Sequence, residues 1–215
     1  MDIEKSVIIG KIRTAIDDIA PSVTDSFTDD TNTELWQATW HAVQALLLEL
    51  PLDMLEPSAM ANPTITGNTD GSGKITLDDN FLRFVSLQLS GWLRPVTELM
   101  EPGSNEALSQ TSKWGRGTPE KPRAMLDYDD DGSLIIRYWT AGKDNGTYDH
   151  TISILNYIPM AEQVTTQQQG QVTPAVPYIT CVLKDTAEPL VINRAAAIFF
   201  EGKKEPETAE KFRNM

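Results

Sequence analysis

Three segments between residues 81 and 158 alternate apolar and polar side chains with the period of two that β-strands require. They span residues 81–92, 124–139 and 151–158. The middle segment contains the pair Asp131-Gly132, and Asp-Gly between apolar runs is a strong hairpin signal. Further upstream, the turn-rich stretch GNTDGSGK separates two short alternating runs and predicts another hairpin. The centre of the chain is therefore expected to be a small antiparallel β-domain.

Both ends of the chain show helical spacing instead. A first helix, with Asp2 as its N-cap, is predicted before Pro21 by the apolar residues Ile8, Ile12, Ala15, Ile16 and Ile19. A second helix is predicted over residues 33–50, ended by Pro51, from the spacing of Trp36, Trp40, Val43, Leu47 and Leu50. We expect these helices to form a hairpin in which the two tryptophans pack against Ile12 and Ile16.

The remaining segments complete an α+β fold in a single domain. Residues 96–102 and 104–110 are predicted to form short helical turns. The polar stretch TTQQQGQVTPAVP favours a linker over residues 161–177. Residues 178–215 are predicted to form C-terminal helices, broken at Pro189 and around residues 202–206. The expected order is a helical part (1–60), a β part (61–160), the linker and the C-terminal helical part.

The charge balance excludes one broad class of function. The net charge is −13, whereas sequence-independent DNA binding rests on Lys and Arg neutralising phosphates. Residues 1–60 hold eleven Asp or Glu against three Lys or Arg. Residues 113–123 are locally basic and are expected to form an exposed loop, either merely solvated or docking on an acidic neighbouring surface.

The single cysteine, Cys181, cannot form an internal disulfide. Its apolar neighbours indicate an inert, buried thiol in a helix. The sequence starts MDIEK, without a basic region followed by an apolar stretch, so neither a signal peptide nor a membrane span is expected.

Two acidic stretches resemble calcium-binding loops. The first contains Asp70 and the second contains Asp127, Asp129 and Asp131. Neither has the flanking helices and the full set of ligands of an EF-hand, so both are interpreted as β-turns without a metal ion. The two histidines fall in different predicted elements, and His41 is interpreted as a structural residue of its helix. No nucleophile or phosphate-binding motif occurs, so we expect no enzyme activity and no cofactor.

The C-terminal segment is the best candidate for partner docking. A helix beyond a linker cannot be stable alone, so its apolar face must pack either on its own subunit or in a groove of a partner. The candidate docking residues are Ile192, Ala196, Phe199, Phe200, Lys203 and Lys204.

The order of elements and several short motifs resemble a known family. The motifs are ELPLDML, LDDNFLRFVSLQLSGWLRPV, PEKPRAML, DGSLIIRYWTAG, ISILNYIP and AAAIFFEGKKEPETAEKF. They are similar to those of the head-to-tail adaptors of short-tailed bacterial viruses, that is, the tail tubular protein A group and the ring proteins of crAss-like phages.

The resemblance implies a non-catalytic virion protein with a helical bundle, a small β-domain and a helical or extended C-terminus. It further implies a homo-oligomeric ring, expected to be a dodecamer, which is assembled in the bacterial cytoplasm and binds the portal and other tail or ring proteins. DNA would pass through this ring without specific binding, and no membrane is involved. The alternative interpretation is a carbohydrate- or protein-binding accessory domain built on the β-segment.

Overall fold

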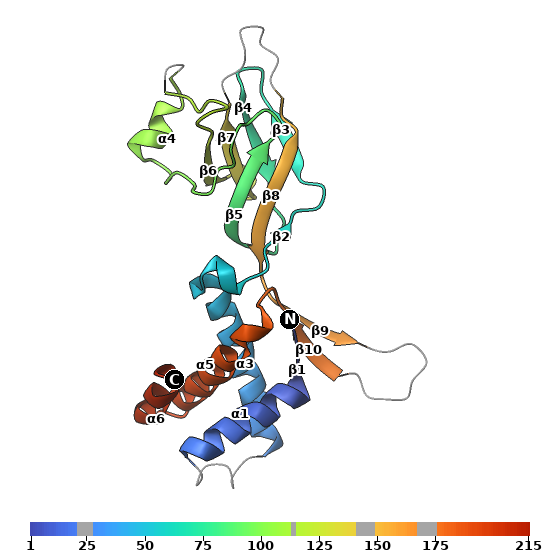
Figure 1. Ribbon diagram of the computed structural model, residues 1–215, viewed down its shortest axis with the longest axis vertical. Coiled ribbons are helices and arrows are strands. Elements are labelled where there is room, and N and C mark those ends of the chain that lie inside the picture. Colours follow the sequence, from blue (N-terminus) through green and yellow to red (C-terminus); the bar gives the residue numbers. More distant parts are fainter. Residues whose placement is uncertain (21–27, 113–114, 141–148, 167–175) are drawn as a thin grey trace. The chain divides into compact units, whose positions relative to one another are not determined.

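The computed structural model describes residues 1–20, 28–112, 115–140, 149–166 and 176–215. The chain has an α+β fold, with helices near both ends and antiparallel strands between them. It divides into two compact units, shown in Figure 1. The helical unit comprises Met1–Glu56 and Met160–Met215, and the β unit comprises Pro57–Pro159. The β unit is thus an insertion between two halves of the helical unit.

The helical unit contains four α-helices and a small sheet among its described residues. Its elements are β1 (Asp2–Glu4), α1 (Lys5–Ile19), α3 (Asp29–Glu49), the 3-10 turn η1 (Leu52–Met54), β9 (Glu162–Thr166), β10 (Val176–Thr180), the 3-10 turn η2 (Asp185–Ala187), α5 (Glu188–Gly202) and α6 (Pro206–Arg213).

The two N-terminal helices form where helical spacing predicts them, but their starts differ. Asp2 is not an N-cap, because it lies in β1 and α1 begins after Glu4. Helix α3 begins earlier than residue 33 because Thr28 and Thr31 form a reciprocal capping box. Asp29 and Asp30 follow in the first turn, where negative charge is favourable.

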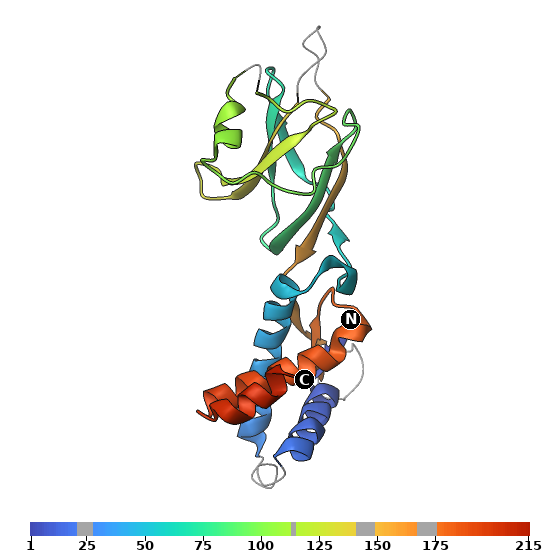
Figure 2. The ribbon, with the colours of Figure 1, turned by 60° about the vertical axis from the view of Figure 1, so that its left-hand side comes forward.

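The core of the helical unit is organised around α5. This helix packs on α3, α6 and α1, and α3 contacts α5 more extensively than it contacts α1 (Figure 2). The fully buried Phe200 stacks on the buried Phe212 of α6, with ring centroids 5.7 Å apart. The two N-terminal helices therefore share their core with the C-terminal helices.

The linker predicted over residues 161–177 is wrong where the structure describes it. Strands β9 and β10 pair antiparallel, and β10 also pairs with β1 in the order β1-β10-β9. Residues 167–175 of the predicted linker lie outside the described residues. Cys181 follows β10 and is buried as expected, but it does not lie in a helix. Its backbone N–H donates to the carbonyl of Met1 at 3.1 Å, which extends the β1–β10 ladder.

In its described residues, the β unit contains two antiparallel sheets, with strand orders β2-β8-β5 and β3-β4-β7-β6. Its elements are β2 (Ser58–Ala59), β3 (Thr64–Gly67), β4 (Ser72–Thr76), β5 (Phe81–Leu89), α4 (Asn105–Ser109), β6 (Arg123–Tyr128), β7 (Leu134–Trp139) and β8 (Ile152–Pro159). Side chains from both sheets form one core, which includes Ile75, Leu87, Leu89, Trp92, Ile136, Tyr138 and Leu155.

The turns of the β unit follow their sequence signals, with one exception. The expected hairpins β3–β4 and β6–β7 are present, and Gly71 and Gly132 adopt the positive φ angles that these turns require. Residues 96–102 do not form the predicted helical turn. Val96 instead bridges to Leu87, and Met100 bridges to Met125, so this segment runs along strand edges.

In the part of the chain that the structure describes, no helix is both long and apolar enough to cross a membrane.

Candidate functional site

An apolar groove of the helical unit lies between α3 and α5. Its volume is about 350 Å³. Helix α3 contributes Thr33, Glu34, Gln37, Ala38 and His41, and α5 with the residue after it contributes Ile198, Phe199, Gly202 and Lys203. We call this feature the α3–α5 groove.

One rim of the groove is charged. Lys203 Nζ lies 2.5 Å from Glu34 Oε2 and 5.4 Å from the centre of the Phe199 ring. Both side chains of the ion pair are nearly half exposed, so the pair stabilises the fold by no more than about 1 kcal/mol. The rim therefore keeps its charges accessible beside an apolar floor.

The structure divides the six predicted docking residues. Phe199 and Lys203 line the α3–α5 groove. Ala196 and Phe200 are fully buried inside the helical unit, and Ile192 is half-buried. Lys204 is exposed just beyond α5, with φ at +61°. The apolar face of α5 is thus covered by the chain's own helices, and it is not available as a whole for a partner.

The sequence did not identify the residues of α3 that line the groove as candidate docking residues. Gln37 and His41 are exposed on α3, so His41 is not the packed structural histidine expected there. Their i, i+4 spacing was a usable signal, because residues four apart lie on one face of a helix. What the sequence does not reveal is which helix packs beside that face.

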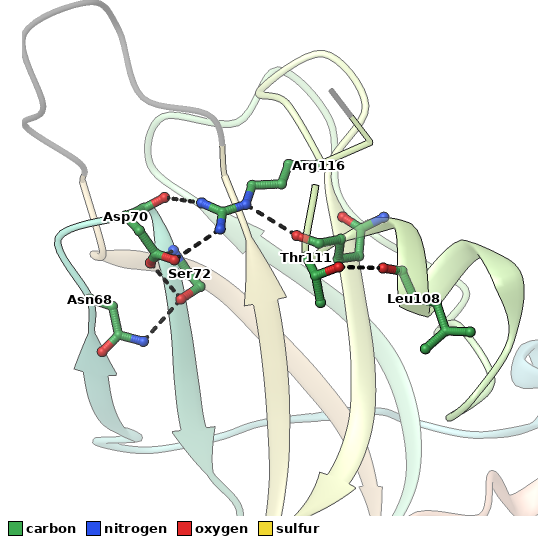
Figure 3. Close-up of polar contacts among 7 residues, drawn as sticks. Asn68, Asp70, Ser72, Leu108, Thr111 and Arg116 are labelled. Atoms are coloured by element: carbon green, nitrogen blue, oxygen red, sulfur yellow. Dashed lines mark hydrogen bonds and ion pairs between the residues drawn. The ribbon is translucent and has the colours of Figure 1, made fainter. Parts of the chain in front are cut away.

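The first acidic turn is bound by an arginine (Figure 3). The Arg116 guanidinium lies 3.0 Å from Asp70 Oδ2, and it also donates to the backbone carbonyls of Asp70 and Gln110, at 2.7 and 3.1 Å. Ser72 donates its N–H and its hydroxyl to Asp70 Oδ1, at 3.0 and 2.7 Å. These hydrogen bonds, with Ser72 first and the Arg116 charge after it, lower the pKa of Asp70.

The second acidic turn is likewise occupied by neighbouring groups. Asp129 pairs with Lys74, which lowers the pKa of Asp129. Asp127 pairs with Arg137 at 2.6 Å. The N–H of Ser133 donates to Asp131 at 2.9 Å and lowers the pKa of that carboxyl. Among the described residues, no group of three or more His, Cys, Asp or Glu is arranged to hold a metal ion.

The basic stretch 113–123 is only partly an exposed loop. Arg116 is half-buried and bound as described, and Arg123 pairs with Glu106 at 2.6 Å. Lys121 is exposed, whereas residues 113 and 114 lie outside the described part of the chain. Arg116 therefore holds the β3–β4 turn in place, which leaves less basic charge for an acidic partner than the sequence suggests.

A partly buried polar contact lies in the β unit. The Tyr138 hydroxyl is 2.6 Å from Nδ1 of His150, and the Tyr138 ring meets Trp92 edge-on at 6.2 Å. Burial raises the pKa of Tyr138 to about 12. A Cβ atom on Gly73 would lie 2.3 Å from the Tyr138 hydroxyl, so only glycine fits there. We interpret this contact as part of the packed interior, because Tyr138 is fully buried.

The chain matches no known protein-family model and no characterised protein sequence.

Proposed function

We propose that this chain is a structural protein of a bacteriophage particle. In this proposal it is a subunit of the head-to-tail connector ring, which joins the portal to the tail around the DNA channel. The protein acts in the virion after assembly in the cytoplasm of the host bacterium, and DNA passes through the ring without sequence-specific contacts.

The observation that carries the proposal is the arrangement of elements along the chain. A helical unit built from both chain ends carries an inserted small β unit. The resemblance of the sequence motifs to those of phage adaptors implies the same parts, namely a helical bundle, a small β-domain and a helical C-terminal region. Ring closure requires a head-to-tail contact between copies whose rotation closes.

Within this proposal the α3–α5 groove is the docking surface for an apolar side chain of the portal. An apolar floor with a charged rim is typical of grooves that take an apolar anchor from a partner. Ala38, Ile198 and Phe199 supply the floor, and Glu34 and Lys203 supply the rim.

Particle mass and electron microscopy test the ring. We expect the purified protein, mixed with the portal protein encoded by the same virus, to form a ring-shaped complex with many copies of this chain, twelve in the dodecamer. A chain that stays monomeric both alone and with the portal contradicts the proposal.

A pair of adjacent lysines tests the docking surface. Lys203→Glu places a second acid beside Glu34 at the rim, whereas Lys204→Glu makes the same charge change outside the groove. We expect Lys203→Glu to weaken portal binding by about tenfold or more and Lys204→Glu to leave it nearly unchanged. Equal effects of the two variants would contradict docking at this groove.

A further inference from the structure

The outer edge of β9 carries backbone groups that point away from its sheet. Met1 and Cys181 form a hydrogen-bonded pair, with two bonds of 2.8 and 3.1 Å. Ile179 of β10 lies two residues from Cys181, so its N–H and C=O groups also point toward β1. Successive residues of an antiparallel strand direct their N–H and C=O groups to opposite sides. The backbone groups of Tyr178 in β10 therefore point toward β9, where they meet those of Val164. It follows that the N–H and C=O groups of Gln163 and Thr165 point outward. We call these groups the β9 edge.

The β9 edge lacks most of the devices that protect an edge strand, and Glu162 is the one charged residue of its strand. Strand β9 contains no Pro and no Lys, and its five-residue pairing with β10 has no bulge. Among the described residues, β10 is the strand that pairs with β9, and no other strand lies beside it (Figure 1). In the β unit, by contrast, the bridges of Val96 to Leu87 and Met100 to Met125 cover parts of the edges of β5 and β6. An uncovered strand edge is a template for pairing with another chain.

The β9 edge is complementary to itself. When two β9 strands lie antiparallel about a twofold axis at Val164, Gln163 of each copy faces Thr165 of the other. All four of these residues point their N–H and C=O groups across the interface, so four backbone hydrogen bonds form. The one charged residue of the strand, Glu162, then lies opposite Thr166 of the second copy, and no acid faces another acid. We propose that two copies of this protein pair through their β9 edges and form a continuous six-stranded sheet.

Charge disfavours the pairing of β9 with the opposite edge of this sheet. The opposite edge is β1, which has only three residues and carries Asp2 and Glu4, both exposed. Pairing β9 with β1 of a second copy would bring these acids close to Glu162. Pairing β9 with itself avoids the repulsion and provides a longer run of backbone hydrogen bonds.

This inference goes beyond the proposed function and does not depend on it. A twofold contact closes with two copies, whereas a ring needs a head-to-tail contact. Pairing through the β9 edge and assembly into a ring can therefore fail separately, and different measurements detect them.

Cysteine cross-linking of the full-length protein tests the register. The two Val164 residues would be directly opposite in a non-hydrogen-bonded pair, with Cα atoms about 4.5 Å apart, which suits a disulfide. The two Gln163 residues would lie diagonally, about 7 to 8 Å apart, which is too far. We expect the Val164→Cys protein to form a disulfide-linked dimer under mild oxidation. The Gln163→Cys protein should form at least about tenfold less of this dimer. The native Cys181 is buried and serves as an unreactive background. Equal cross-linking of the two variants would overturn the proposal.

A proline placed on each edge of the sheet provides the second test. Thr165→Pro removes an outward N–H from each copy, hence two of the four intermolecular hydrogen bonds, and it breaks no bond to β10. Asp2→Pro places the same residue on the β1 edge. Sedimentation over a range of protein concentrations should show a dimer that Thr165→Pro weakens about tenfold or more and that Asp2→Pro leaves unchanged. A protein that is monomeric at every concentration, or a dimer unaffected by Thr165→Pro, would refute the pairing.

Discussion

Arg116 links its own loop to the β3–β4 turn, which is distant in sequence. Its guanidinium binds the β3–β4 turn through Asp70 and the region after α4 through the Gln110 carbonyl. The sequence predicted that this arginine lies in an exposed loop, either solvated or docking on an acidic surface, because glycines and prolines are interspersed around it. The local pattern holds no information on Asp70, which lies 46 positions away along the chain.

We predict that Arg116→Ala lowers the free energy of unfolding by about 2 kcal/mol, because it removes hydrogen bonds to a carboxylate and to two carbonyls. Urea denaturation followed by circular dichroism measures this loss. The ordinary pKa of Asp70 is 3.8, and the folded protein lowers it. The contribution of the carboxylate is therefore fully present well above pH 3.8 and is lost as the pH falls through the lowered pKa. The difference between the variant and the parent should shrink in strongly acidic buffer.

Arg123→Ala is the matched control for this prediction. Arg123 pairs with Glu106, and both side chains are nearly half exposed, so its loss should cost no more than about 1 kcal/mol. If Arg116→Ala and Arg123→Ala unfold at the same urea concentration as the parent, Arg116 does not stabilise the β unit as described.

Individual elements differ in how far the sequence predicts them. The hairpins of the β unit and helix α3 rest on local signals, namely Asp131-Gly132 and the spacing of apolar residues, and these signals were sufficient. Strands β9 and β10 were missed because β10 also pairs with β1, at the other end of the chain. The prolines and glutamines of residues 165–177 suggested a linker. The pairing of β10 with β1 and β9 instead makes the described part of this segment strand.

Contacts between distant segments also explain why the sequence predicts the candidate site only in part. Helix α5 was predicted from its apolar spacing, and two of the predicted docking residues, Phe199 in this helix and Lys203 just after it, line the groove. The sequence did not predict which residues of α3 and α6 pack against α5, because tertiary packing decides these contacts. Because the apolar face of α5 is already covered by the chain itself, an experiment on docking has to change rim residues and leave the core intact.

Helix α6 is predicted to be essential for the stability of the helical unit. Phe212 is 1% exposed and stacks on Phe200, so Phe212→Ala should cost about 3 to 5 kcal/mol. Thermal denaturation followed by circular dichroism should show a clearly lower midpoint. Deleting residues 203–215 would remove the same contact, so a failure of that shortened protein to bind a partner would not distinguish docking from misfolding.

Lys211→Ala is the control in the same helix. Lys211 is exposed, and alanine favours helix formation, so this variant should melt close to the parent. A Phe212→Ala protein as stable as Lys211→Ala would mean that α6 does not contribute to the core.

On the scale of the whole molecule, the two units form from different parts of the chain. The helical unit needs both chain ends, because α5 packs on α3 and β1 pairs with β10. The β unit is continuous in sequence, and its first strand pairs with its last, as Ser58 lies opposite Tyr157. The folding of the helical unit therefore depends on both ends of the chain, whereas the pairings of the β unit all lie within residues 57–159.

We predict that residues 57–159 fold as an isolated fragment. The fragment keeps both sheets, the core residues that join them and the β2–β8 pairing that holds its two ends together. Cooperative thermal unfolding and well-dispersed amide resonances are the expected results.

A shorter fragment, residues 57–149, provides the contrast. It lacks β8, which is the strand between β2 and β5, and it loses the buried residues Leu155, Tyr157 and Ile158. Strand β5 would then lose its neighbour in the sheet, and the core would open along one side, so this fragment should remain unfolded. An unfolded 57–159 fragment, or a folded 57–149 fragment, would show that the β unit does not fold in the way its internal pairing indicates.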